Sequence, residues 1–261
     1  MRTRVETFED TVRTAAFIIP AYRARDSVAD VVGGLRRAWT TAMERLAETE
    51  RSQWRAEALY LTVDDGSGDD TGARAEAAGA TLVRHPRNLG KGAALLTGLR
   101  WAQERELETV VTVDADGQHP PEEAVHLQLL PAPQEALILG VRDLRRDGAP
   151  WPNRFSNGFS NVFLSAYGRM RLHDTQCGLR RYPVERTLQL EPRDPGYAFE
   201  AEVILRFARN GLPIVQEPIS VFYPPEDERV THFHSVRDPA RIVRRVLWTV
   251  ATVPVRRHPR P

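Results

Sequence analysis

Short apolar runs alternate with amphipathic segments over the first 140 residues of the chain. The runs consist mainly of aliphatic and β-branched residues, which is typical of buried strands, and the apolar residues between them recur at helical spacing. The predicted strands cover 15–19, 59–63, 81–84, 109–113 and 136–139, and the predicted helices cover 27–47, 69–78, 90–105 and 122–130. This alternation predicts an α/β fold with a mostly parallel central sheet and helices on both faces.

The pattern is less regular after residue 140. A polar segment at 143–152 precedes apolar residues with helical spacing over 155–170, and another helix is predicted over 199–210. Two short strands are expected at 214–215 and 219–223, separated by a proline. No clear linker, repeat or low-complexity segment interrupts the chain, so we expect one domain with an elaborated C-terminal part.

Composition and charge narrow the class of protein. With 41% hydrophobic and 27% charged residues, the 261-residue chain has an ordinary globular composition. A formal net charge of +1 argues against a general nucleic-acid-binding protein. The charge is uneven, because residues 1–139 carry 22 acidic and 16 basic side chains, whereas residues 140–261 carry 13 and 20. This asymmetry suggests a cation site in the first part and an anionic partner in the second, with chance as the alternative.

Cysteine content and hydropathy bear on the compartment. The single cysteine, Cys177, excludes an intrachain disulfide and any cysteine-rich zinc site. Residues 1–14 are charged and lack the apolar stretch of a signal peptide. No run reaches the roughly 18 apolar residues of a membrane-spanning helix. We therefore expect a cytoplasmic protein, either free or peripheral at the inner face of the membrane.

A pair of carboxylates follows the fourth predicted strand. Asp114 and Asp116 are two residues apart at the end of 109–113, where they can converge on one hard divalent cation such as Mg²⁺ or Mn²⁺. Gln118 would add a neutral oxygen, and His119 is a less favoured ligand. A solvated turn is the alternative, because Asp-Gly is a common turn pair.

A second acidic cluster, VDDGSGDDT, follows the second predicted strand. Its glycines are spaced one residue too widely for a dinucleotide-binding fingerprint, and its acidic residues would repel a pyrophosphate at the helix start. An NAD-dependent dehydrogenase is therefore disfavoured. We interpret Asp64 or Asp65 as a hydrogen-bond acceptor for a base or ribose. The segment 90–92 also lacks the flanking residues of a P-loop.

Six motifs occur in a fixed order: IIPAY, VDDGSGDDT, NLGKGAALLTGL, VTVDADGQHP, DTQCGLRRY and YAFEAEV. This set resembles family 2 glycosyltransferases with the GT-A fold, and the subgroup closest in appearance is the dolichyl- or polyprenyl-phosphate mannose or glucose synthases. The resemblance covers roughly residues 15–235. Two features depart from it. Arg23-Ala24 stand where the family often has Asn-Glu, and the C-terminal membrane helices of many relatives are lacking.

The resemblance implies a division of the chain. A short extension at 1–14 precedes a GT-A domain at 15–235, and a basic amphipathic helix and tail follow at 236–261. Within the domain, 15–140 would bind the nucleotide sugar and 141–235 the acceptor.

The resemblance also implies roles for individual residues. The implied donor-binding residues are Pro20, Ala21, Tyr22, Asp64, Asp65, Lys91, Asp114, Ala115 and Asp116. Asp114, Asp116 and Gln118 would hold Mg²⁺ or Mn²⁺ on the donor diphosphate. The implied catalytic residues are Asp116, Asp174, Arg180 and Glu200. The implied contacts to an acceptor phosphate are Arg180, Arg229, His232 and His234. For Arg180 the alternative is a structural ion pair, and for the two histidines a pair on one strand face.

The implied reaction is a metal-dependent, inverting transfer of a hexose from a GDP-mannose or UDP-glucose type of donor to a polyprenyl or dolichyl phosphate. Because the second pKa of a phosphate is about 6, such an acceptor needs little help from a base. A hydroxyl of a lipid, polyketide or glycan is the alternative acceptor, and it would need Asp174, Glu200 or Glu202 as a base. A catalytically inactive nucleotide-sugar-binding protein is a third hypothesis.

The last segment is strongly basic, since residues 229–261 contain eight arginines and one acidic residue. Apolar residues at helical spacing over 242–253 predict an amphipathic helix there. Such a helix can lie on an anionic membrane surface, or it can pack on the domain or on a second subunit. The sequence leaves the oligomeric state open.

Overall fold

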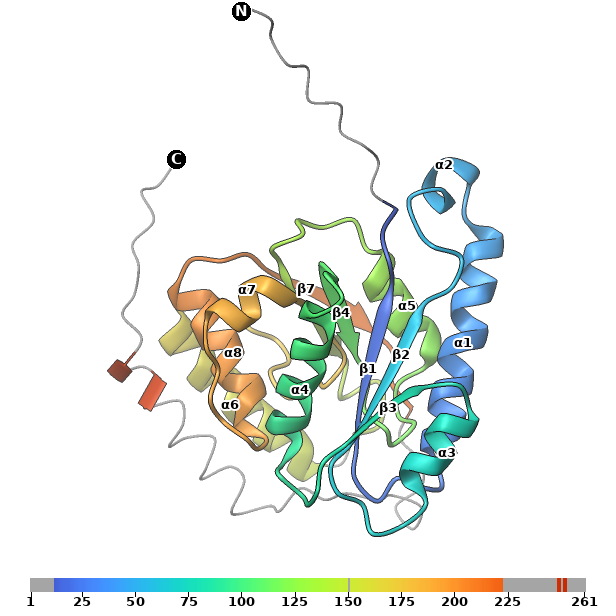
Figure 1. Ribbon diagram of the computed structural model, residues 1–261. Helices are drawn as coiled ribbons and strands as arrows, with labels where there is room; N and C mark the ends of the chain where they lie inside the picture. Colours follow the sequence, from blue (N-terminus) through green and yellow to red (C-terminus); the bar gives the residue numbers. More distant parts are fainter. Residues whose placement is uncertain (1–11, 150, 223–247, 250, 253–261) are drawn as a thin grey trace, which may run out of the picture.

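The computed structural model describes residues 12–149, 151–222, 248–249 and 251–252. Seven strands form one sheet in the order β3-β2-β1-β4-β6-β5-β7 (Figure 1). The strands are β1 (Ala16–Ala21), β2 (Leu59–Asp64), β3 (Thr81–Arg84), β4 (Thr109–Thr112), β5 (Leu137–Arg142), β6 (Arg180–Pro183) and β7 (Ile214–Ile219). The helices of the described segments are α1 (Val28–Arg45), α2 (Glu48–Arg51), α3 (Thr71–Ala77), α4 (Lys91–Gln103), α5 (Pro121–Leu129), α6 (Trp151–Gly168), α7 (Val184–Gln189) and α8 (Ala198–Arg209).

The sheet is parallel except for β6. This strand lies between β4 and β5 and runs antiparallel to both, whereas the other neighbouring strands pair in parallel. The mostly parallel α/β sheet expected from the sequence is confirmed. Because parallel strands end at the same edge, the segments after β1, β2 and β4 meet there.

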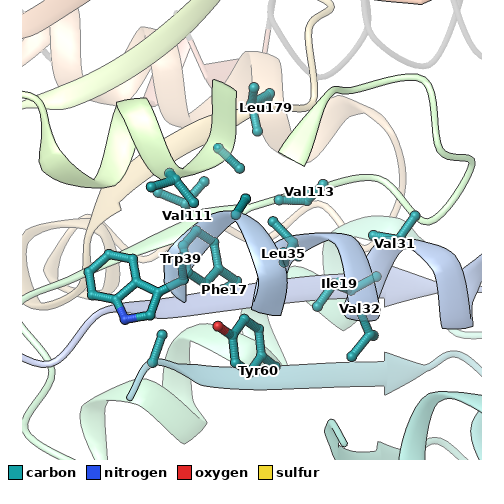
Figure 2. Packing of buried hydrophobic residues seen from close by; sticks show 14 of the residues in the cluster. Phe17, Ile19, Val31, Val32, Leu35, Trp39, Tyr60, Val111, Val113 and Leu179 are labelled. Carbon is teal, nitrogen blue, oxygen red and sulfur yellow. The ribbon is translucent and has the colours of Figure 1, made fainter. Parts of the chain in front are cut away.

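The two faces of the sheet are filled by alternate residues of β1. Phe17 and Ile19 pack under α1 and α5, where the Phe17 ring stacks on Tyr60 at a centroid distance of 5.7 Å (Figure 2). Ile18 packs on the opposite face, under α4. A Cβ atom on Gly98 would lie only 2.6 Å from Ile18, so the glycine allows α4 to lie close to the sheet.

The helices cover the two faces of the sheet in two groups. Residues of α1, α3 and α5 belong to one apolar core, and residues of α4, α6, α7 and α8 belong to the other (Figure 1). None of the helices in the described segments is long and apolar enough to cross a membrane.

The sequence predictions differ from the structure in the second half. The strand expected at 214–215 continues through Pro218 to Ile219 as β7, whereas the separate strand expected at 219–223 is wrong, because residues 220–222 are not in a strand. This proline is tolerated because β7 is an edge strand that pairs only with β5. The elements α2, β6 and α7 were not predicted. Most of the basic segment at 236–261 lies outside the described residues.

Candidate active site

A cleft of about 560 Å³ opens at the carboxyl ends of β1, β2 and β4. Most of the expected donor-binding residues line it, namely Pro20, Ala21, Tyr22, Asp65, Lys91, Asp114, Ala115 and Asp116. Gln118 and Tyr197 line it as well. The expected metal ligands and the expected nucleotide contacts therefore share one concave site, whose size suits a nucleotide-sized ligand.

The loop after β4 is held from two sides. The Ser27 hydroxyl donates a hydrogen bond to the Ala115 carbonyl at 2.5 Å. The Gln118 backbone N–H donates to Asp116 Oδ1 at 3.0 Å, and Gly117 between them has a φ of 73°. A left-handed residue at this position closes the turn, which explains the glycine after the carboxylate pair.

Gly178 packs directly against Asp114. A Cβ atom at Gly178 would lie 2.3 Å from Asp114 Oδ2, so a larger residue would displace the carboxylate. The Thr112 hydroxyl donates to the Gly178 carbonyl at 2.8 Å and fixes this approach. Sequence reasoning did not single out Gly178, although it lies within one of the six motifs.

Lys91 lies between two carboxylates at the first residue of α4. Its Nζ atom is 2.8 Å from Asp114 Oδ1 and 3.3 Å from Glu200 Oε1. The glycines on either side of Lys91 are required by the facing 194–196 loop. A Cβ at Gly90 would lie 2.3 Å from the Pro195 carbonyl oxygen, and one at Gly92 would lie 2.3 Å from that of Asp194.

The charges in the cleft shift one another's pKa values. Burial opposes ionisation of Lys91, but the carboxylates of Asp114 and Glu200 outweigh it and raise the lysine pKa above its ordinary value. Burial likewise opposes ionisation of Asp114, and the Lys91 charge outweighs it and lowers the Asp114 pKa. Burial raises the pKa of Asp116 to about 6, and the Asp114 charge adds to this shift. Burial also lowers the pKa of His119 to about 4.

The oxygen atoms that Asp114, Asp116 and Gln118 offer at this loop fit Mg²⁺ or Mn²⁺ as metal ligands. The Asp116 carboxylate is buried and lies close to the negative charge of Asp114, and both effects oppose its ionisation. A divalent cation bound by both carboxylates would remove this repulsion. Within the described segments, no group of three or more His, Cys, Asp or Glu side chains forms a complete metal cage. Magnesium usually keeps water and substrate phosphates as ligands, so two carboxylates and an amide are an adequate protein contribution.

Asp65 and Asp64 have different surroundings. Asp65 lines the cleft, and its carboxylate accepts hydrogen bonds from His85 Nδ1 at 2.7 Å and from the backbone N–H groups of Leu89 and Gly90 at 2.9 and 2.8 Å. It thereby holds the loop that leads to Lys91. Asp64 is fully buried, is not part of the cleft lining, and accepts hydrogen bonds from the Ser67 backbone N–H and from Arg84.

Asp174 forms a buried ion pair with Arg142, the last residue of β5. Arg142 Nε lies 2.7 Å from Asp174 Oδ2, and Arg142 Nη2 lies 3.1 Å from Oδ1. The Arg142 charge also acts on Asp114 and Asp116, which places it beside the cleft. Sequence reasoning missed Arg142, although its position at a strand end is the signal that revealed the other site residues.

The structure does not bring the Arg180 guanidinium into the cleft, which corrects its expected contact with an acceptor phosphate. The side chain is fully buried and donates to the backbone carbonyls of Cys177, Glu200 and Thr175 at 2.8, 2.9 and 2.9 Å. A guanidinium that donates from all three of its nitrogen atoms to carbonyls inside the core is a structural group. Glu202 is similarly buried, in an ion pair with Arg206.

A second cleft, of about 620 Å³, is lined by Arg142. Three arginines line it, Arg142, Arg145 and Arg154, together with the aromatic residues Trp151 and Phe155. This basic, aromatic cleft was not predicted. The expected phosphate ligands Arg229, His232 and His234 lie outside the described residues.

Comparisons with known proteins agree with this geometry. The sequence profile of "Glycosyl transferase family 2" matches residues 16–188. The polyprenol monophosphomannose synthase of Mycolicibacterium smegmatis is 28% identical over 228 residues, which cover 82% of this chain and 79% of that protein. The undecaprenyl-phosphate mannosyltransferase of Micrococcus luteus is 32% identical over 219 residues, covering 78% of this chain and 81% of that protein.

A solved structure shares the fold. Glucosyl-3-phosphoglycerate synthase from Mycobacterium tuberculosis, in complex with Mn²⁺, uridine diphosphate and phosphoglyceric acid, superimposes with a TM-score of 0.65. The two sequences are 21% identical, and the match covers 93% of this chain and 80% of the other.

Proposed function

We propose that this chain, which belongs to glycosyl transferase family 2, moves a hexose from a nucleotide-diphosphate sugar to a polyprenyl or dolichyl phosphate at the cytoplasmic face of a membrane. The donor would be of the GDP-mannose or UDP-glucose type. The observation that carries the proposal is the Asp114–Asp116 carboxylate pair in a nucleotide-sized cleft at the strand ends.

The donor side of the reaction follows from this cleft. Asp114, Asp116 and Gln118 would hold Mg²⁺ or Mn²⁺, which supplies positive charge to the leaving diphosphate. Lys91 would place a compact ammonium next to the same phosphates. Asp65 orients the loop that carries Lys91 and, as a residue of the cleft lining, is available to the base or ribose.

The acceptor side would be the neighbouring basic cleft. Arg145 and Arg154 suit a phosphate, because each guanidinium can donate two parallel hydrogen bonds to phosphate oxygens, whereas Arg142 is already paired with Asp174. Trp151 and Phe155 at the same cleft would contact the first isoprene units. The names of the two curated relatives support a polyprenyl phosphate as acceptor. Arg229, His232 and His234 remain proposed contacts to that phosphate, on the ground of the family resemblance.

The ion pairs favour a phosphate over a hydroxyl as acceptor. The three carboxylates considered as bases are each engaged by a cation: Asp174 by Arg142, Glu200 by Lys91 and Glu202 by Arg206. A hydroxyl acceptor would need one of them free to take a proton, whereas an ionised phosphate can attack the anomeric carbon without a base.

A donor screen followed by an acceptor comparison tests the proposal. Thermal unfolding is measured with guanosine and uridine diphosphates, each with and without Mn²⁺, because specific binding raises the unfolding midpoint. The preferred nucleotide sugar is then offered with a polyprenyl phosphate and, separately, with the free polyprenol. Transfer to the phosphate alone supports the proposal, and transfer to the polyprenol would establish the hydroxyl alternative. Binding without transfer to either would indicate an inactive nucleotide-sugar-binding protein.

A further inference from the structure

The outer face of α6 carries a stripe of large apolar side chains. Trp151, Phe155, Phe159 and Val162 are 69%, 64%, 57% and 73% exposed. They are spaced four, four and three residues apart, so they share one side of the helix. Ala166, one turn further on, is exposed on the same side. We call these five residues the α6 stripe. Such a continuous apolar surface on a folded domain usually marks an interaction site.

The stripe is a feature of a well-anchored helix. On the opposite side of α6, Asn157, Ser160 and Leu164 are buried, and the Ser160 hydroxyl is hydrogen-bonded to that of Thr175 at 2.8 Å. The helix also packs on α8. The rings of Trp151 and Phe155 stack at a centroid distance of 5.5 Å, which orders the exposed aromatic end.

The charges around α6 indicate the chemistry of what covers it. The helix contains no acidic residue, and its one charged side chain is Arg154. Exposed arginines flank it at both ends. Before the helix, Arg145 and Arg146 are offset by Asp143 and Asp147, whereas Arg169 and Arg171 after it leave a net positive charge. An apolar stripe that ends in tryptophan and is bordered by cations is complementary to the interface of a bilayer with anionic lipids.

We propose that the α6 stripe docks on the surface of a membrane that contains anionic lipids. The apolar side chains enter the boundary between head groups and acyl chains, and the flanking arginines contact lipid phosphates. Trp151, Arg154 and Phe155 also line the basic cleft, so docking places the opening of that cleft at the lipid surface. The use of this placement for an acceptor rests on the proposed function, whereas the docking itself does not.

Vesicle sedimentation tests the docking with the full chain. The vesicles contain phosphatidylcholine with about 30% phosphatidylglycerol, or phosphatidylcholine alone, and hold neither acceptor lipid nor nucleotide sugar. The test variant is Phe159→Glu/Val162→Glu, since neither residue lines either cleft. The control is Val12→Glu/Gln103→Glu, which adds the same two charges at exposed sites outside α6. A milder pair, Phe159→Ala/Val162→Ala, removes apolar area without adding charge.

We expect the wild type and the control to bind the anionic vesicles, and less at high salt. The glutamate pair should bind about tenfold less or weaker still, with an unchanged unfolding midpoint and unchanged sugar transfer to a short, water-soluble prenyl phosphate. If the glutamate pair misfolds, the alanine pair should show the same loss to a smaller degree. Two sedimentation results would overturn the docking: wild-type protein that stays in the supernatant, or variants that sediment with the vesicles as much as the wild type does. A third contrary result is a wild-type oligomer, formed without lipid, that the variants convert to a monomer. Failure of sugar transfer alone would count only against the proposed function.

Discussion

The ammonium group of Lys91 lies 2.8 Å from Asp114 Oδ1, so the only lysine of the chain neutralises one member of the carboxylate pair. Its second partner, Glu200, comes from the start of α8 in the other half of the domain. The ion pairs therefore connect the loop after β4 with the helix that follows the 194–196 loop. A ligand phosphate that enters the cleft would meet this cation beside the proposed metal ligands.

Lys91→Met is expected to weaken binding of the nucleoside diphosphate by about tenfold, because a charge-assisted contact contributes about 1.5 kcal/mol or more. Binding of the nucleoside without phosphates should change little. Titration calorimetry with both ligands measures the difference. Lys91→Arg keeps the charge, but the branched guanidinium has to fit between two glycines that face the 194–196 loop. We expect it to recover only part of the affinity. Equal losses for nucleoside and diphosphate would place Lys91 away from the phosphates.

Gly178→Ala is expected to weaken metal binding and lower turnover, because the added methyl group overlaps the Asp114 carboxylate. Overpacking of this kind costs about 1–3 kcal/mol of folding stability. Mn²⁺ titration, turnover and chemical denaturation measure the three effects. Gly68→Ala is the matched control, since a Cβ atom there has no neighbour within 4 Å. Wild-type metal affinity in Gly178→Ala would show that the Asp114 position is not critical.

Metal binding should depend on pH through Asp116. Its pKa is raised to about 6 in the metal-free protein, so the carboxyl group is protonated below that pH and charged above it. Because the metal binds the carboxylate, affinity should be constant above about pH 7 and fall by up to about tenfold per unit below pH 6. His119, with its pKa lowered to about 4, stays neutral across this window. Mn²⁺ titrations in buffers of different ionisation enthalpy also report the released proton.

The corresponding control is Asp116→Asn, which cannot be protonated in this range. It should bind Mn²⁺ weakly at every pH and without proton release. The same pH dependence in Asp116→Asn and wild type would assign the titration to another group.

Arg142→Ala is expected to cost about 3 kcal/mol of folding stability, because it leaves the Asp174 carboxylate buried without its cation. Arg142→Ala/Asp174→Asn should recover part of that loss, since the second change removes the unpaired charge. Denaturant unfolding of the four proteins in this cycle gives the coupling energy. Arg145→Ala, at an exposed site of the same cleft, should change stability by less than about 0.5 kcal/mol while raising the acceptor KM. A coupling energy near zero would contradict the ion pair.

The first half of the fold could be predicted because each buried strand is a short apolar run and each covering helix has one apolar side. β6 could not, because its first two residues are Arg180 and Arg181, which suggest an exposed segment. Both arginines are buried, and their guanidinium groups donate to backbone carbonyls. The Arg181 guanidinium donates to the carbonyls of Leu127, Gln128 and Leu130 at the end of α5. Sequence does not reveal whether an arginine will meet a carbonyl or a phosphate.

The site was predictable where its residues follow a strand. Asp65, Asp114 and Asp116 do so, and they line one cleft. Gly178 and Arg142 were missed because their roles depend on contacts between segments far apart in the chain, a close approach to Asp114 and an ion pair to Asp174. The strand end at Arg142 and the motif around Gly178 are visible in the sequence, but the partner that each residue contacts follows from tertiary packing.

The acid stability of the product distinguishes a sugar joined to a phosphate from a sugar joined to a hydroxyl. The chain is incubated with its preferred labelled nucleotide sugar, Mn²⁺ and a polyprenyl phosphate, and the labelled lipid is treated with mild acid. We predict a product that releases its sugar under mild acid, because a sugar joined through phosphate to a prenol is labile, and we predict none from Asp116→Ala. A labelled lipid that survives the acid, or that Asp116→Ala makes at the wild-type rate, would contradict metal-dependent transfer to a phosphate.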